Sequence, residues 1–411
     1  MSDVITFGCR LNFYESEVIR NNLKKAQLDD VVVVHSCAVT NEAERQVRSK
    51  IRKLYNNNAN VKIIVVGCAA QLNPELYINM PGVIKVLGNQ DKLKYENYLT
   101  ADKVIVSKIE NSREVAHDSI KEFSGKSRAL IEIQNGCNHE CTFCVITKAR
   151  GNNRSLHIED IIGRVRDCVD NGYNEVVFTG VDISDFGLDI YGQRMLGTMI
   201  RRVLRAVPQL HRLRLSSIDV AEIENDLLDI IVNEPRFMPH LHLSLQSGNN
   251  LILKRMKRRH NREQVIEFCD RISSKRKEVA FGADIIVGFP TETEKMFDDT
   301  VKLIEEANIS YLHVFPYSRR EGTSAARMPQ VIQEVKKRRV RYLLEFAEKR
   351  LNNFYNTLLH TKQRVVVEKS DTGRAENFAL VKFSNNKVQL QSIVEVEIER
   401  IEGNYLVGQV L

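Results

Sequence analysis

Residues 129–144 read ALIEIQNGCNHECTFC, and this stretch decides the fold. Its apolar start predicts a β-strand, and three cysteines follow on a short loop at Cys137, Cys141 and Cys144. Three thiolates with this spacing suit an iron–sulfur cluster, which normally takes four ligands, so that one iron keeps an open coordination site. Zinc is the competing metal, although a structural zinc site needs a fourth ligand. His139 lies inside the loop, and we expect its ring to point away.

The strand before this loop is the first of six apolar runs that alternate with helical patterns. Strands that alternate with helices form parallel sheets, and six such units in succession indicate a partial or complete barrel. Clear helical patterns lie, for example, at 157–170 and 293–307. The expected strands are 129–133, 175–179, 212–216, 240–245, 281–287 and 311–315.

A smaller unit of the same kind precedes the barrel. Val- and Ile-rich runs at 4–7, 31–34 and 61–66 alternate with helical patterns at 15–28 and 41–55. Continuous apolar strands between helices indicate a buried parallel sheet. The first part of the chain therefore predicts a small doubly wound α/β domain.

Each of these three apolar runs is followed by a cysteine, at Cys9, Cys37 and Cys68. The carboxyl ends of parallel strands meet at one edge of a sheet, so the three thiols are expected to converge there. A free cysteine is often a small core residue, but this alternative does not explain the same position three times. We therefore expect a second cluster with one open iron. Cys168 and Cys269 lie within helical patterns and are expected in the core.

The remaining segments complete a five-part organisation. A charged stretch at 108–127 is a plausible linker, and 331–359 predicts one long, basic, amphipathic helix. Short alternating strands follow at 364–368, 378–382, 394–398 and 405–409, typical of a small all-β barrel or sandwich. The expected parts are an N-terminal domain 1–110, a linker 111–127, a barrel 128–330, a connecting helix 331–360 and a β domain 361–411.

Composition and charge narrow the class of protein. The chain has 411 residues, of which 43% are hydrophobic and 27% charged, as in ordinary globular proteins. No apolar run approaches the roughly 20 residues of a membrane span, and the N-terminus does not resemble a secretory signal, so a cytoplasmic location is expected. In that compartment the eight cysteines stay reduced. Lys and Arg exceed Asp and Glu by 60 to 53, which fits a polyanionic partner.

The C-x3-C-x2-C loop after a first barrel strand resembles the radical S-adenosylmethionine (SAM) superfamily. With the N-terminal three-cysteine domain and a C-terminal module similar to TRAM, a nucleic-acid binder, the whole chain resembles the methylthiotransferase family. The resemblance implies two [4Fe–4S] clusters, a (β/α)6 partial barrel and a reaction that uses two SAM molecules. One SAM methylates a sulfur at the auxiliary cluster, and the other gives a radical that removes hydrogen from C2 of an adenine. The methylated sulfur then joins that carbon.

Short strings around the first cysteines point to one subgroup. TFGCRLNFYESE, CAVTNEAERQVR and, at 313–330, HVFPYSRREGTSAARMPQ are similar to the MtaB-type subgroup. That similarity implies a transferase that modifies N6-threonylcarbamoyladenosine at position 37 of the tRNA anticodon stem-loop, with flavodoxin or ferredoxin as electron donor. The GCQMN of the isopentenyladenosine subgroup and the GCPKN of the ribosomal-protein subgroup are absent. His35 stands where the family usually has Asn, and 146–148 replaces a segment that typically contains Pro.

Two other functions stay open at this point. One is methylthiolation of isopentenyladenosine in tRNA, and the other is a non-catalytic RNA-binding protein with a structural metal. Polar groups at the carboxyl ends of barrel strands read as ligand contacts, with helix capping or core packing as the alternatives. The resemblance places Phe143 near the adenine of SAM and the backbone of 179–182 near its amino group. The expected SAM contacts are Phe143, Thr179, Gly180, Val181, Asp182, Ser216, Ser217, Gln246, Ile286 and Val287.

Basic residues supply candidate contacts to SAM or to RNA phosphates. They are Arg150, Arg154, Lys257 and Arg258, with solvated surface positions as the alternative. Two basic runs, at 254–262 and 336–341, contribute further candidates, and a solvated helix face is the competing interpretation of each. The C-terminal β domain carries no net charge, so RNA binding there would require loop contacts and stacking on Phe378 or Phe383, unless these two rings belong to its core.

Overall fold

The computed structural model describes residues 3–112, 115, 120, 123, 125–384 and 388–411. The N-terminal domain contains one five-stranded parallel sheet whose strands lie side by side in chain order. Its strands are β1 (Asp3–Thr6), β2 (Val31–Ser36), β3 (Lys62–Gly67), β4 (Val83–Leu87) and β5 (Val104–Ile105). Its helices are α1 (Arg10–Lys25), α2 (Asn41–Asn57), α3 (Cys68–Leu72), α4 (Pro74–Ile78) and α5 (Glu96–Leu99).

This sheet is buried on both faces, which explains its continuous apolar strands. Neighbouring residues of β2 point to opposite sides: Val33 packs with α1 and α5, and Val34 packs with α2, α3 and α4. Thr40 caps α2 by accepting a hydrogen bond from the Ala43 amide at 3.1 Å. The predicted α/β domain with helices on both faces is confirmed.

Six parallel strands form the predicted partial barrel in two halves. One half has the strand order β10–β9–β6, and the other has the order β11–β12–β13. Two isolated parallel bridges, Leu213 with Phe237 and Ile218 with Leu243, join the halves. The strands are β6 (Ala129–Glu132), β9 (Glu175–Thr179), β10 (Arg212–Leu215), β11 (His240–Gln246), β12 (Ala280–Val287) and β13 (Ile309–Pro316). A small antiparallel pair, β7 (Gln134–Asn135) and β8 (Arg154–Ser155), flanks the cysteine loop.

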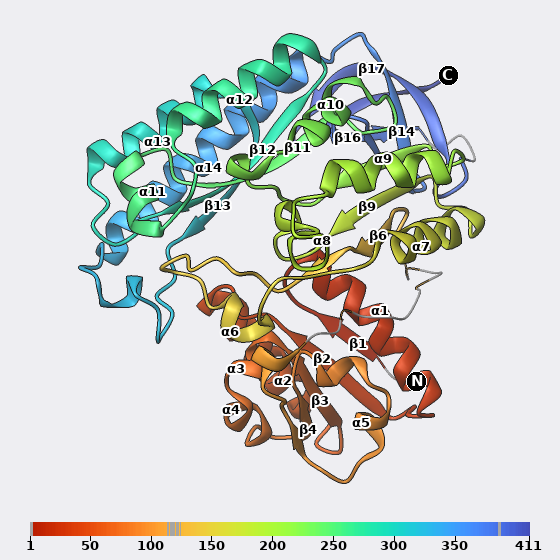
Figure 1. Ribbon diagram of the computed structural model, residues 1–411, viewed down its shortest axis with the longest axis vertical. Coiled ribbons are helices and arrows are strands. Elements are labelled where there is room, and N and C mark those ends of the chain that lie inside the picture. Colours follow the sequence, from red (N-terminus) through yellow and green to blue (C-terminus); the bar gives the residue numbers. More distant parts are fainter. Residues whose placement is uncertain (1–2, 113–114, 116–119, 121–122, 124, 385–387) are drawn as a thin grey trace.

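Helices cover the outer face of the barrel (Figure 1). Alternate side chains of β11, such as Leu241 and Leu243, enter one large apolar core beneath them, so the other residues of the strand face the barrel interior. The helices are α7 (Ile158–Asp170), α8 (Leu188–Tyr191), α9 (Leu196–Ala206), α10 (Asn225–Asn233), α11 (Asn250–Met256), α12 (Arg262–Lys275) and α13 (Glu294–Glu306). Cys168 and Cys269 are each 1% exposed in this core, as predicted.

The predicted linker at 111–127 lies largely outside the described residues. Three of its described side chains, Val115, Ile120 and Phe123, are buried in the same core as the barrel strands. The Phe123 amide also donates to the Tyr173 hydroxyl at 2.9 Å. These three described residues are therefore packed against the barrel.

The C-terminal part consists of α14 (Gln333–Asn356) and a closed β-barrel in the order β14–β15–β16–β18–β17. All its neighbouring strands are antiparallel except β16 and β18. The strands are β14 (Lys362–Lys369), β15 (Thr372–Ala375), β16 (Leu380–Phe383), β17 (Ile393–Glu402) and β18 (Tyr405–Val410). The four predicted strands are present, and β15 was missed because Thr-Gly-Arg-Ala lacks apolar alternation. In the described part of the chain, every helix is too short or too polar to serve as a membrane span.

Candidate active site

The three N-terminal cysteines, here called the N-terminal trio (Cys9, Cys37 and Cys68), stand at the carboxyl edge of the first sheet. Gly8 precedes the first of them with φ +96°, and a Cβ added there would lie 2.8 Å from the Cys37 sulfur. Only glycine accepts this backbone conformation and this close approach without strain. The first two loops are therefore in direct contact.

The third cysteine joins them. Burial, followed by charge on Cys68 and on Cys9, raises the pKa of Cys37 to about 12. Cys37 and Cys68 directly follow Ser36 and Gly67, which are partners in the register of β2 and β3, so their loops begin side by side. Buried thiols with raised pKa values stay protonated by themselves, so thiolate ligands form there only with a bound cationic centre. Three sulfurs around one point suit a cluster with one open iron.

The side chain of Asn12 is hydrogen-bonded to both of the first two cysteine loops. Its amide nitrogen donates to the Phe7 carbonyl at 2.8 Å and to the Ser36 carbonyl at 3.2 Å, one residue before Gly8 and one before Cys37. Its oxygen accepts a hydrogen bond from Arg150 at 2.7 Å. The side chain is 1% exposed, so it orients the loops and has no surface role.

A buried ion-pair network continues from Asn12. Arg150 forms two hydrogen bonds with Glu15, at 2.9 and 2.8 Å, and Lys92 donates to the same carboxylate at 2.8 Å. Although burial raises the pKa of Glu15, these two cations outweigh it and hold that pKa well below its usual range. His35 lies 3.0 Å from the Lys92 ammonium and bonds Ser16 at 2.8 Å. Burial and Lys92 lower the pKa of His35, which therefore stays neutral.

The second cysteine loop, here called the loop trio (Cys137, Cys141 and Cys144), is fixed by hydrogen bonds at both ends. The Cys137 amide donates to Gly151 at 3.0 Å, and the Thr142 amide donates to Met256 at 3.1 Å. Backbone amides of His139 and Ile146 lie 3.4 Å from the Cys137 and Cys144 sulfurs, respectively. Such N–H groups stabilise cluster-bound thiolates.

Arg258, an expected SAM or RNA contact, lies beside this loop. Its guanidinium is 3.6 Å from the Cys141 sulfur, and it also bonds Asp219 at 2.6 Å and the Ser244 carbonyl at 2.8 Å. The positive charge therefore faces the loop trio from the barrel side. Lys257 points elsewhere and pairs with Glu140 at 2.9 Å on the surface.

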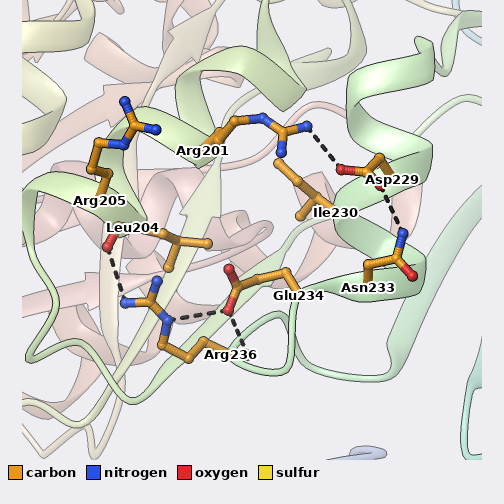
Figure 2. A pocket seen from close by; sticks show the side chains of 8 residues that line it. All are labelled: Arg201, Leu204, Arg205, Asp229, Ile230, Asn233, Glu234 and Arg236. Carbon is orange, nitrogen blue, oxygen red and sulfur yellow. Dashed lines mark hydrogen bonds and ion pairs between the residues drawn. The ribbon is translucent and has the colours of Figure 1, made fainter.

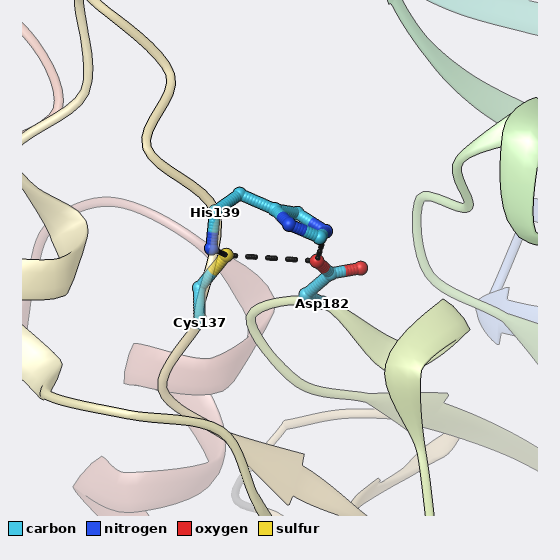
Figure 3. Close-up of side chains that lie close together, drawn as sticks. All are labelled: Cys137, His139 and Asp182. Atoms are coloured by element: carbon cyan, nitrogen blue, oxygen red, sulfur yellow. Dashed lines mark hydrogen bonds and ion pairs between the residues drawn. The ribbon is translucent and has the colours of Figure 1, made fainter. Parts of the chain in front are cut away.

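His139 differs from our expectation. Its ring lies beside the thiol of Cys137 instead of pointing away, and its Nε2 is 2.6 Å from Asp182 (Figure 3). Asp185 and Glu222 also lie within 3.4 Å of that nitrogen, which explains the attraction of the ring to this position. The two close groups that contain His139 are Cys137, His139 and Asp182, and His139, Asp182, Asp185 and Glu222; neither includes Cys141 or Cys144.

The two trios are neighbours. Cys68 packs in one apolar cluster with Val145 and Ala149, which follow the loop trio, and Asn89 donates to the Cys68 sulfur at 3.4 Å and to the Ala149 carbonyl at 2.7 Å. Arg150 links the segments that support the two trios. It lies on α6 (Ile146–Arg150), which follows the loop trio, and it bonds Glu15 of α1, the helix that begins directly after Cys9. In Figure 1, α6 lies next to the N-terminal domain.

Several expected SAM contacts surround the loop trio. Phe143 and Ile286 pack against the same small apolar cluster, and Phe143 meets Phe289 edge to face at 6.3 Å between ring centroids. Asp182 lies 3.5 Å from the Cys137 sulfur. Val287 points the opposite way, into the core beneath the helices, so only its neighbour Ile286 faces the interior.

The segment after β9 is held by Gln134. The side-chain oxygen of Gln134 accepts hydrogen bonds from the Val181 and Asp182 amides at 2.9 and 2.8 Å. A Cβ on Gly180 would lie 2.5 Å from the Gln134 carbonyl, so glycine is needed for this packing whether or not a ligand binds. Thr179 is 1% exposed at the strand end. These contacts leave the SAM role of the segment a prediction.

The other expected contacts at strand ends are partly accessible. Ser216 and Ser217 follow β10 and are half-buried. Gln246, also half-buried, ends β11 with φ +70°, a left-handed conformation that is uncommon for a residue other than glycine. Such strain at a barrel strand end is often found at ligand sites. Their contact with SAM stays a prediction.

Arg150 and Arg154 differ from the contacts expected of them. Arg150 is 2% exposed and bonded to Glu15 and Asn12, as described above, so RNA phosphates cannot reach it. Arg154 is 8% exposed and donates to the carbonyls of Arg150 and Asn152 at 2.9 and 2.8 Å. Both side chains stabilise the connection between the two trios.

Several cations of the two basic runs are paired within the chain. In the first, Arg262 pairs with Glu306, and His260 is buried against Asp219. In the second, Arg339 pairs with Glu292 at 2.7 Å. Carboxylates that already hold these cations weaken the case for phosphate contacts at both runs.

The two aromatic residues proposed for RNA stacking have other partners. Phe383 is 2% exposed in the core of the C-terminal barrel. Phe378 stacks on His240, with ring centroids 4.5 Å apart, inside the interface between the two barrels. The stacking prediction is therefore wrong for Phe383, and the ring of Phe378 is already in use.

A separate surface pocket of about 240 Å³ lies between α9 and α10 (Figure 2). It contains none of the six cysteines. Arg201 and Arg236, two of its lining residues, are already paired with Asp229 and Glu234 at 3.0 and 3.1 Å. We assign the chemistry to the cysteine trios and not to this pocket.

Comparison with known proteins agrees with this geometry. Residues 131–304 match the radical SAM superfamily, and residues 2–88 match the uncharacterized protein family UPF0004. The chain is 49% identical to the threonylcarbamoyladenosine tRNA methylthiotransferase MtaB of Rickettsia prowazekii, over 98% of this chain and 96% of that protein. It is 34% identical to the MtaB of Bacillus subtilis, over 98% and 95%.

Two further matches are more distant. The tRNA-2-methylthio-N(6)-dimethylallyladenosine synthase of Thermotoga petrophila is 30% identical over 99% of this chain and 96% of that protein. Among solved structures, the radical SAM methyltransferase TsrM from Kitasatospora setae has a TM-score of 0.55 at 12% identity, covers 79% of this chain and 73% of its own, and shows the fold alone. On the full-length similarity at 49% identity, the chain belongs to the MtaB-type radical SAM methylthiotransferase family.

Proposed function

We propose that this enzyme transfers a methylthio group to C2 of N6-threonylcarbamoyladenosine at position 37 of tRNA. The observation that supports the proposal is the packing of Cys68, from one cysteine trio, against Val145 and Ala149, which directly follow the other. One trio alone suits radical generation, and the second suits a site that holds the sulfur to be inserted. The identity of 49% to an MtaB supports this substrate over others.

The chain's own residues have a positioning task. An aromatic C–H bond is not acidic enough for acid–base catalysis by a side chain. The bound clusters and SAM would therefore supply the one-electron chemistry. The protein has to place the adenine C2 between the two trios, and the Arg150–Glu15 pair fixes the distance between their supports. We include in the proposal a [4Fe–4S] cluster at each trio, the anticodon stem-loop as partner and flavodoxin or ferredoxin as electron donor.

Isopentenyladenosine is the alternative substrate. A relative named for the dimethylallyl product is 30% identical, against 49% for the MtaB relative, and the chain lacks the GCQMN string. A non-catalytic protein with a structural metal is disfavoured, because each trio offers three thiols and structural zinc needs four ligands.

Nucleoside analysis of tRNA tests the proposed substrate. We expect deletion of the gene to remove 2-methylthio-N6-threonylcarbamoyladenosine and leave N6-threonylcarbamoyladenosine in its place. Expression of the wild-type chain should restore the product, and expression of the Cys141→Ala variant should not. If the deletion removes only the isopentenyl product, the substrate assignment is wrong, and if it removes neither, the tRNA assignment is wrong.

A further inference from the structure

Arg10 differs from Arg150, Arg258 and Arg339 because it has no ion-pair partner among the described residues. It directly follows Cys9 at the start of α1, and its side chain is half-buried. Among the described residues, no carboxylate lies within ion-pair distance of its guanidinium, and no hydrogen bond to its side chain is formed. Its nitrogens are not among the buried unpaired atoms of the described residues, so the guanidinium is accessible and can donate hydrogen bonds to a ligand.

The side chain reaches the interior of the radical barrel. Its guanidinium carbon lies 5.9 Å from the centre of the Phe378 ring, which stacks on His240 of β11. His240 alternates with leucines that face the outer core, so the imidazole belongs to the interior face. Arg10 therefore lies between the N-terminal trio and the amino end of the barrel, where His240 begins β11.

The surroundings carry an excess of positive charge. Three more guanidiniums lie around the same ring, at 4.2 Å for Arg374, 5.2 Å for Arg128 and 5.3 Å for Arg214. Two carboxylates form ion pairs with this group of three guanidiniums: Glu175 pairs with Arg214 at 2.6 Å, and Glu368 pairs with Arg128 at 2.8 Å. An anion is the ligand that this charge balance favours.

We propose that Arg10 binds the carboxylate of the amino-acid group on the substrate nucleoside and so selects a threonylcarbamoyl-bearing adenosine over one with an apolar group. This inference rests on the proposed function. The guanidinium fork matches a carboxylate in two hydrogen bonds, and the neighbouring Cys9 is part of the N-terminal trio. A carboxylate bound by Arg10 therefore holds the attached adenine close to the N-terminal trio. An apolar isopentenyl group leaves the same cation buried and unpaired.

The test uses anticodon stem-loops with the reconstituted holoenzyme. Three loops differ only at position 37: threonylcarbamoyladenosine, the same nucleoside with its carboxylate converted to a methylamide, and unmodified adenosine. For the wild-type protein we expect the amide to lower kcat/KM and raise the dissociation constant by about 10- to 100-fold, the usual contribution of hydrogen bonds to a charged group. For Arg10→Gln we expect the acid and the amide to be equivalent, and for Arg10→Lys we expect part of the preference to return.

The controls separate the possible outcomes. Lys24→Gln removes an equal charge from the exposed end of the same helix and should keep the full preference for the acid. Iron content and SAM cleavage of Arg10→Gln should equal those of the wild type, which shows that the variant is folded. Equal weakening of all three loops by Arg10→Gln would assign the residue to an RNA phosphate and overturn the inference. If the wild type modifies none of the loops, the proposed function fails, and if it modifies them without preference for the acid, only this inference fails.

Discussion

Cys37→Ala is expected to abolish methylthiolation while reductive cleavage of SAM stays measurable. Cys37 belongs to the N-terminal trio, and its removal leaves the loop trio and the nearby Arg258 in place. A cluster that loses one of three ligands is not held firmly, so the sulfur to be inserted is lost. The measurements are 5′-deoxyadenosine release and product formation on a stem-loop, both under anaerobic conditions.

Cys141→Ala is the paired variant, and it should abolish both activities. Cys168→Ala serves as the matched control, because that cysteine lies in the apolar core, 1% exposed, and belongs to neither trio. The control should retain both activities. Equal loss of SAM cleavage in Cys37→Ala and Cys141→Ala, with the N-terminal domain still folded by limited proteolysis, would contradict separate roles for the two trios.

Arg150→Gln should strongly lower the stability of the protein. The change leaves the Glu15 carboxylate 0% exposed with Lys92 as its remaining cation, and it deprives Asn12 of a hydrogen bond. Removing one partner of a buried ion pair typically costs about 3–5 kcal/mol. We expect a drop of several degrees in the thermal midpoint and a large loss of methylthiolation, because the supports of both trios move apart.

An exposed arginine gives the comparison. Arg400 pairs with Glu402 at 2.7 Å on the surface of the C-terminal barrel, where both side chains are about half exposed. Arg400→Gln should therefore change stability by less than about 1 kcal/mol. Similar midpoints for the Arg150 and Arg400 variants would show that the buried network does not hold the two trios together.

The strands and the cysteine positions were predictable because they depend on local patterns. A run of Val and Ile marks a strand buried on both faces, and the residue after it falls at the carboxyl edge of the sheet. β9 (Glu175–Thr179) was predicted to the residue. The fold class of all three parts was therefore predictable from the sequence. The predicted resemblance of the central barrel to the radical SAM superfamily is confirmed by the match of residues 131–304.

The buried network could not be predicted in the same way. Glu15 and Arg150 are 135 residues apart, and a Glu on an amphipathic helix ordinarily reads as part of its solvated face. One signal was present: polar residues occupy positions 12, 15 and 16, on the face of α1 that also carries Ile19 and Leu23. The role of Phe378 likewise depends on contacts between distant segments.

Iron bound per chain after anaerobic reconstitution tests the two-site account most directly. The measurement compares the wild type with one variant in which the N-terminal trio is replaced by alanine and another in which the loop trio is replaced. We expect about eight irons per wild-type chain and about four in each variant. The variant without the N-terminal trio should still cleave SAM, and the variant without the loop trio should not. A wild-type value of about four, or a value of about eight without the N-terminal trio, would contradict the account.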